Sequence, residues 1–113
     1  MDIDTKERVA EIRRLNEEFR TTFRGGKVVL TASVAALPSP DKAAALQAVA
    51  EFKDFNEEND PHQERDYGSF DLVGREYWFK LDYYNLDLSG ASEDPADPAK
   101  TKRILTVGLA MDW

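Results

Sequence analysis

The sequence predicts a single α+β domain over residues 1–113, with an antiparallel sheet centred on a β-hairpin at residues 68–84 and two helices covering one face. Apolar residues recur at three- and four-residue steps in two segments, and four others have the composition or alternation of strands. These segments follow one another in the order α-β-α-β-β-β, and strands grouped in this way favour an antiparallel sheet. A chain of 113 residues is long enough for one hydrophobic core.

The first expected element is a helix over residues 4–24, partly peripheral to the domain. Asp4 and Glu7 have the spacing of a capping box, and Gly25-Gly26 ends the helix. One apolar stripe runs along it: Val9, Ile12, Leu15, Phe19 and Phe23. Its arginines (8, 13, 14 and 20) are interleaved with acidic residues, so we expect these charges to lie on a solvated face.

A strand over residues 27–34 and a second helix follow. The strand is rich in β-branched residues, and its inward residues are expected to be Val28, Leu30, Ala32 and Val34. Ser39 is the predicted N-cap of the helix, with Pro40 at its first position. Its predicted buried edge consists of Leu46, Val49, Phe52 and Phe55, and the helix should end near Asn56.

The hairpin at residues 68–84 is the strongest local signal. Phe70 and Leu72 alternate with polar residues on its first arm, and Tyr77, Phe79, Leu81 and Tyr83 alternate with other residues on its second. A type II′ turn at Gly74-Arg75 would pair Val73 with Glu76 and Phe70 with Phe79. An acidic loop over residues 85–101 then leads to a last strand, residues 102–111, whose inward residues are expected to be Leu105, Val107, Leu109 and Met111.

Composition and charge exclude several functions. The chain has no cysteine, which excludes disulfides and thiol catalysis, and it has no apolar run of the ~20 residues that a membrane span needs. Its N-terminal residues lack a signal-peptide pattern, so we expect a cytoplasmic location. The net charge is −7, and residues 41–97 contain fifteen acidic and five basic residues. This excess of acidic residues argues against direct binding to nucleic acid or to membranes, and it favours a partner with a basic surface.

One candidate site is built around the single histidine. If the segment before the hairpin is extended, His62, Glu64 and Asp66 project to the same side, because side chains alternate with period two. Such a set could serve a small metal-dependent or acid/base enzyme. The alternative is that Asp60-Pro61-His62 forms an ordinary turn. The sequence has no phosphate-binding glycine loop and no catalytic triad, and it indicates no cofactor or metal.

The other candidate site is a protein-binding surface. The polar face of the hairpin mixes aromatic and charged residues, which either form a partner surface or pack as an ordinary edge. Together with the acidic loop, this face predicts the following binding residues: Asp71, Trp78, Asp82, Tyr84, Asp87, Glu93, Asp94 and Asp97. The resulting hypothesis is a non-enzymatic acidic interaction protein that binds a basic protein surface, with nucleic-acid mimicry as one form of that binding.

Several segments of the chain resemble a known family. They are Val-Val-Leu-Thr (28–31), Val-Ala-Ala-Leu-Pro (34–38), Glu-Asn-Asp-Pro-His-x-Glu (58–64), Asp-Tyr-Gly-Ser-Phe (66–70), Phe-Lys-Leu-Asp-Tyr-Tyr (79–84), Asp-Pro-Ala-Asp-Pro (94–98) and Arg-Ile-Leu-Thr (103–106). In this order they are similar to domain-of-unknown-function family 3768 (DUF3768), whose members are small bacterial proteins. The resemblance covers residues 28–113. It implies an origin on plasmids or other mobile elements and no established activity.

Overall fold

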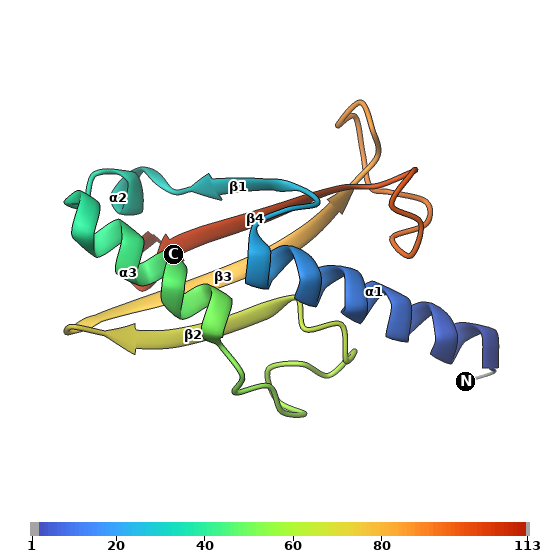
Figure 1. Ribbon diagram of the computed structural model, residues 1–113, viewed down its shortest axis with the longest axis horizontal. Coiled ribbons are helices and arrows are strands. Elements are labelled where there is room, and N and C mark those ends of the chain that lie inside the picture. The colour runs from blue at the N-terminus through green and yellow to red at the C-terminus, as the bar shows by residue number, and fades with distance from the viewer. Residues whose placement is uncertain (1–2, 113) are drawn as a thin grey trace.

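The computed structural model describes residues 3–112, with side chains from Thr5 onward, and it has the α+β class expected from the sequence (Figure 1). Helix α1 (Ile3–Thr22) is followed by strand β1 (Lys27–Leu30), a short helix α2 (Ala32–Ala35) and helix α3 (Ser39–Glu51). Strands β2 (Tyr67–Leu72), β3 (Arg75–Tyr84) and β4 (Lys102–Leu109) come next, and a 3-10 turn η1 (Ala110–Asp112) ends the described chain.

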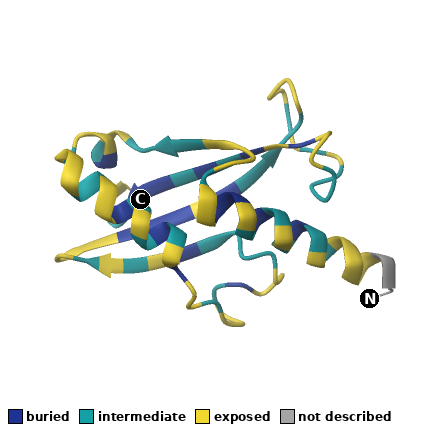
Figure 2. Cartoon of the chain, in the orientation of Figure 1, coloured by how far each residue is buried: buried dark blue, intermediate teal, exposed yellow. Residues whose placement is uncertain are grey.

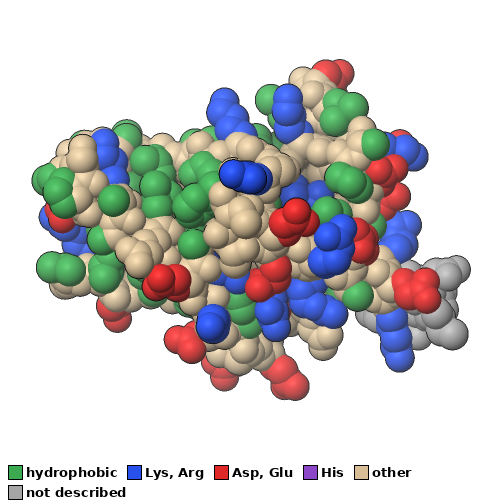
Figure 3. Space-filling model, viewed as in Figure 1, with side chains coloured by type: hydrophobic (Ala, Val, Ile, Leu, Met, Phe, Trp, Pro, Cys, Tyr) green, Lys and Arg blue, Asp and Glu red, His purple; other side chains and the backbone are tan. Residues whose placement is uncertain are grey.

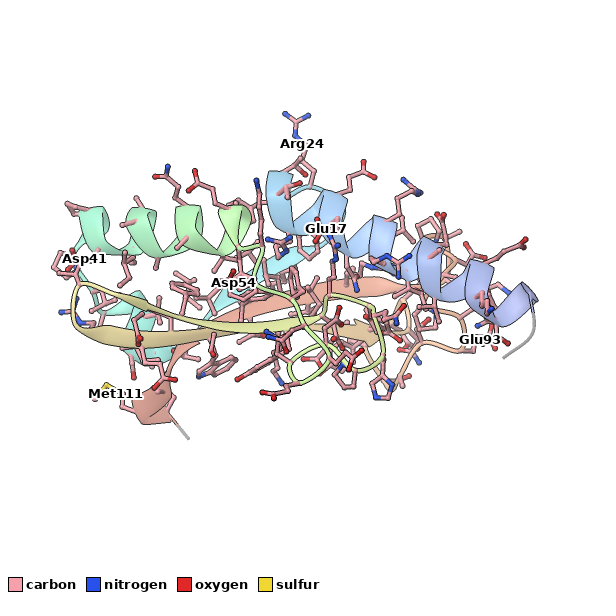
Figure 4. All side chains as sticks on the ribbon, turned by 90° about the horizontal axis from the view of Figure 1, so that it is seen from below. Glu17, Arg24, Asp41, Asp54, Glu93 and Met111 are labelled. Carbon is pink, nitrogen blue, oxygen red and sulfur yellow. The ribbon has the colours of Figure 1, made fainter. Side chains whose placement is uncertain are left out.

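The four strands form one mixed sheet in the order β1-β4-β3-β2. Strands β2, β3 and β4 are antiparallel as expected, whereas β1 lies parallel to β4, with Val28 opposite Leu105. The sheet is therefore not purely antiparallel. Helices α1 and α3 lie end to end over one face of the sheet, as expected, and within residues 3–112 no long helix covers the other face (Figures 1 and 4).

The core lies between these two helices and the centre of the sheet (Figure 2). Phe19 of α1 and Val49 of α3 pack against the inward residues of β3 and β4: Phe79, Leu81, Leu105 and Val107. Because inward and outward residues alternate along a strand, the predicted alternation in β3 and β4 identified these core residues correctly.

The hairpin forms where it was predicted, but its register was wrong by two residues. Phe70 lies opposite Tyr77 and Leu72 opposite Arg75, so the two-residue loop is Val73-Gly74 and not Gly74-Arg75. Both loop residues have positive φ, 50° at Val73 and 77° at Gly74, as a type I′ turn requires. A shift of two residues keeps every side chain on its predicted face.

Other boundaries also differ from the prediction. The first strand ends at Leu30, because the Thr31 side chain accepts a hydrogen bond from the Val34 amide and caps α2. Helix α3 includes the predicted N-cap Ser39, and Pro38 precedes it without a side-chain cap. Helix α1 likewise begins at Ile3 and includes the predicted N-cap Asp4. Helix α3 ends at Glu51, ahead of the expected end near Asn56.

Two residues have a different environment from the one expected. Met111 follows the end of β4, lies in η1 and is 79% exposed, so it is not an inward strand residue. Arg20 was placed on a solvated face and is 1% exposed. Its guanidinium donates to the carbonyl oxygens of Val49 (2.8 Å) and Phe52 (2.9 Å) and pairs with Glu17. Arg20 therefore caps the last turn of α3 from a neighbouring helix.

Candidate functional site

The sheet face opposite α1 and α3, which we call the open face, carries a mixture of aromatic and charged side chains. Its side chains come from alternate positions of the strands, including Trp78, Lys80, Asp82 and Tyr84 on β3. A groove of about 490 Å³ runs across it. This open-face groove is lined by Val29, Trp78, Lys80, Asp82, Tyr84, Leu88, Ile104 and Thr106.

Trp78 lines the open-face groove and is largely buried against β4. Its indole Nε1–H donates to the carbonyl oxygen of Leu109 (3.0 Å), and its ring lies over the backbone of Gly108. A Cβ at Gly108 would come within 2.3 Å of the Trp78 ring, so only glycine lets the ring lie this close to β4. The sequence analysis did not identify Gly108, although a glycine inside a strand is a known signal of close backbone approach.

The charges in the open-face groove nearly cancel. Lys80 and Asp82 form an ion pair at 3.1 Å with both side chains substantially exposed. An exposed pair of this kind contributes at most ~1 kcal/mol to stability, so it can exchange partners readily. The groove therefore combines apolar and aromatic side chains with one exposed cation and one exposed anion.

The structure brings together some of the predicted binding residues and separates the others. Trp78, Asp82 and Tyr84 line the open-face groove, and Asp87 precedes Leu88 at its edge. Asp71 lies near the hairpin turn opposite Glu76, outside the groove lining.

The acidic residues of the loop over residues 85–101 are largely engaged within the chain. Asp94 forms an ion pair with Arg8 (2.9 Å), and Glu93 lies 3.8 Å from Lys100. Asp97 accepts a hydrogen bond from the Ala99 amide (2.9 Å), in the manner of an Asx turn. Asp87 accepts hydrogen bonds from Ser89, which lower the pKa of its carboxyl. These acids hold the turns of the loop as well as contributing negative charge.

The second candidate site, around His62, does not have the extended backbone that was assumed. Gln63 and Arg65 have positive φ (60° and 54°), and strand β2 begins at Tyr67, so the period-two argument does not apply to this segment. Among the described residues, no group of three or more His, Asp and Glu side chains is arranged to hold a metal ion. His62 itself is exposed and lines a separate groove between α1 and the loop that precedes β2.

Glu64 belongs to a polar network that joins distant segments of the chain. Its carboxylate accepts a hydrogen bond from the Tyr83 hydroxyl (2.6 Å), and that hydroxyl accepts one from the Asn16 amide (2.8 Å). Arg103 donates to the Asn16 side-chain oxygen (2.9 Å) and to the carbonyl of Pro95. Its guanidinium also lies over the Tyr83 ring at 5.3 Å.

Burial within this network changes the acidity of its members. Burial and the neighbouring Glu64 carboxylate raise the pKa of Tyr83, so its hydroxyl stays protonated as a donor. Burial lowers the pKa of Arg103, which is 3% exposed. Burial, followed by the nearby Glu64 carboxylate, raises the pKa of Asp66.

The sequence carried a signal for this network that the pattern analysis did not use. Tyr83 and Arg103 occupy inward positions of the alternation that identified Phe79 and Leu105. Asn16 lies between Ile12 and Phe19 on the apolar stripe of α1. A polar residue at a core position of a strand or helix generally has a buried partner, so these three residues could have been expected to meet.

Comparison with known proteins identifies one family. The model of a family described as "Protein of unknown function (DUF3768)" matches residues 30–112 of the chain. No match is found among curated proteins or among solved structures. Four of the segments that resemble this family each contribute a residue to the polar network: Glu64, Tyr83, Pro95 and Arg103.

Proposed function

Since this chain belongs to the DUF3768 family of proteins of unknown function, we propose from its structure that it is a non-enzymatic interaction protein whose open face binds a partner protein with a basic surface. The observation that carries this proposal is the open-face groove itself. It combines the largely buried Trp78 with the half-buried side chains of Tyr84 and Ile104, and Leu88 at its edge is 48% exposed. Aromatic residues of this kind are enriched at the centres of protein interfaces.

The basic character of the partner follows from the charge of the chain. The net charge is −7, and complementary charge accelerates the encounter of two proteins more than it strengthens the final complex. On the helix-covered side, side chains of both signs are interspersed and form no continuous acidic surface (Figure 3). We therefore assign a steering role to the net charge and the binding energy to the aromatic groove.

Nucleic-acid mimicry has less support than ordinary protein recognition. Asp94 and Glu93 are paired with Arg8 and Lys100, and Asp97 holds a turn, so these acids are not free to form a phosphate-like array. We propose a cytoplasmic partner, encoded by the host or by a mobile element, from the family resemblance alone. Membrane attachment is not part of the proposal, and no helix in residues 3–112 is long and apolar enough to cross a membrane.

The enzyme alternative, centred on His62 with Glu64 and Asp66, has weaker support. The Glu64 carboxylate already accepts the Tyr83 hydroxyl at 2.6 Å, which favours a structural role. Asp66 is half-buried, and its backbone carbonyl accepts the Leu81 amide (2.8 Å) at the entrance to the sheet. A substrate-dependent activity that is lost in His62→Ala, while the fold is kept, would support the alternative.

The proposal can be tested with two substitutions in one loop. Leu88 lines the open-face groove, whereas Leu86, two residues earlier, is similarly exposed and does not line it. Immobilised wild-type protein, Leu88→Lys and Leu86→Lys would be incubated with a bacterial lysate at low salt and again at about 0.5 M salt, where the Debye length is below about 5 Å.

We expect wild type and Leu86→Lys to capture the same basic protein at low salt, and Leu88→Lys to lose it. Both variants change the net charge equally, so a difference between them reports on the groove. Equal capture by Leu86→Lys and Leu88→Lys would contradict the proposal, as would recovery of nucleic acid in place of a protein.

A further inference from the structure

A second groove, separate from the open face, lies between the first half of α1 and the loop that precedes β2. It has a volume of about 470 Å³, within the range of small-molecule sites in proteins. This helix–loop groove is lined by Lys6, Val9, Arg13, Pro61, His62, Gln63 and Glu64. It therefore has nitrogen donors on both walls and an apolar strip formed by Val9 and Pro61.

Among the arginines of α1, the one in the helix–loop groove differs from the others, because it has no carboxylate partner. The other arginines of α1 are each paired with a carboxylate: Arg8 with Asp94, Arg14 with Glu11 and Arg20 with Glu17. Arg13 instead donates to a neutral acceptor, the carbonyl oxygen of Gln63 (2.9 Å). Within the part of the chain that the structure describes, Lys6 and His62 form no hydrogen bond or ion pair.

The backbone of the loop fixes the position of Arg13. Gln63 has a positive φ (60°), and its carbonyl oxygen accepts a hydrogen bond from the Arg13 guanidinium. This single bond leaves the other N–H groups of Arg13 available. Lys6, Arg13 and His62 therefore place three nitrogen donors around one concave surface of a protein whose net charge is −7.

We propose that the helix–loop groove binds a phosphate monoester, with the phosphate on Arg13 and Lys6 and its organic group against Val9 and Pro61. A guanidinium binds phosphate through parallel N–H···O bonds, and a lysine ammonium adds a compact positive charge. The volume of about 470 Å³ exceeds that of a bare phosphate ion, so the groove has room for an organic group beside the apolar strip. This inference is independent of the proposed function of the open face.

Glu64 limits the affinity and supplies a sharp test. Glu64 lines the same groove, so its negative charge repels an anionic ligand. Glutamine at position 64 would remove this charge and keep an oxygen that accepts the Tyr83 hydroxyl. The proposal therefore predicts that Glu64→Gln binds the phosphate more tightly than the wild type, a gain of function that general destabilisation would not produce.

The probes are phenyl phosphate and inorganic phosphate, titrated into ¹⁵N-labelled protein and followed by NMR. We expect saturable shifts at Gln63 and at the Arg13 side chain, with phenyl phosphate binding more tightly than inorganic phosphate. Arg13→Gln should lose roughly tenfold or more in affinity, because charge-assisted hydrogen bonds are removed. Lys6→Gln, an exposed substitution with little effect on folding, should also weaken binding, and Glu64→Gln should strengthen it roughly threefold.

Arg14→Gln is the matched control, because Arg14 belongs to the same helix but lies outside the groove lining and pairs with Glu11. It should bind phenyl phosphate like the wild type. A phosphotyrosine peptide distinguishes the two sources of a phosphate monoester: tighter binding than phenyl phosphate indicates a phosphorylated protein, and equal or weaker binding a free small molecule. The proposal is overturned if no probe saturates at millimolar concentration, or if Arg13→Gln and Lys6→Gln both bind like the wild type.

Discussion

Arg20 joins the two helices of the fold, and its replacement by methionine is expected to destabilise the protein strongly. The Arg20 guanidinium donates to the carbonyl oxygens of Val49 and Phe52, at 2.8 and 2.9 Å, where α3 ends. The Val49 carbonyl also accepts the amide of the C-cap residue Phe52, at the longer distance of 3.4 Å, and the carbonyls at a helix C-terminus generally need such outside donors. Methionine fills a similar volume but has no donor, so the Phe52 oxygen would lose its guanidinium donor and the Val49 oxygen would keep only the longer bond from the Phe52 amide.

The magnitude follows from these contacts. Leaving the Phe52 oxygen without this donor costs about 1–3 kcal/mol, and loss of the shorter bond to the Val49 oxygen costs about 1 kcal/mol. Loss of the guanidinium contact with the Phe55 ring (5.2 Å) adds about 0.5–1 kcal/mol. Removing the buried charge of Arg20 offsets part of this cost. Glu17, which loses Arg20 as a partner, stays partly solvated and close to Arg65 (3.3 Å). The expected net loss is about 3 kcal/mol out of a typical stability of about 5–15 kcal/mol.

Urea denaturation followed by circular dichroism measures this loss as a change in the free energy of unfolding. Arg14→Met is the control, because it makes the same chemical change at an exposed arginine of the same helix, and its unfolding midpoint should match the wild type. If Arg20→Met were as stable as the wild type or more so, the cost of burying the charge would exceed the value of the capping bonds, and the reasoning would be refuted.

Three further substitutions test other parts of the structure. Val73→Asn should stabilise the protein by about 1 kcal/mol in urea denaturation, because a β-branched residue at φ 50° is strained in a type I′ turn that favours asparagine; an unchanged or lower midpoint would contradict the observed register. Gly108→Ala should destabilise it by about 1–3 kcal/mol and alter Trp78 fluorescence, since the added Cβ meets the ring at 2.3 Å; unchanged fluorescence would argue against the described Trp78 position. The folded pKa of Asp66 is raised above its unfolded value of 3.8, so ionising this carboxyl costs stability as pH rises through the folded pKa. Asp66→Asn should therefore be more stable than the wild type at pH 7 and lose that advantage near pH 3. Thermal melts that show no pH-dependent difference between the two proteins would contradict this.

The core of the sheet could be predicted from sequence because alternation along a strand depends only on local spacing. Phe79, Leu81, Leu105 and Val107 were assigned to the core for this reason, and all of them are buried there. The hairpin register could not be chosen in the same way. Registers that differ by two residues place the same side chains on the same face, and Gly74 can occupy a central turn position in either register.

The parallel pairing of β1 with β4 had no local signal, because these strands lie more than 70 residues apart and strand order depends on packing. The buried Arg20 was missed because helix patterns assign arginines to solvent, although a buried arginine is stable where carbonyls and a carboxylate surround it. The residues of the candidate sites were partly predictable. Trp78, Asp82 and Tyr84 share a strand face and meet in the groove, whereas the partners of Glu64 come from segments that only the fold brings together.

The central claim is that the open face contacts the partner, and site-specific photo-cross-linking tests it most directly. A photoreactive phenylalanine analogue would replace Leu88 in the open-face groove and, in a second protein, Ala44 on the exposed side of α3. On low-salt incubation with the captured partner, the account predicts a cross-linked complex from position 88 and none from position 44. Cross-linking from position 44 with none from position 88 would place the partner on the helices and contradict the account.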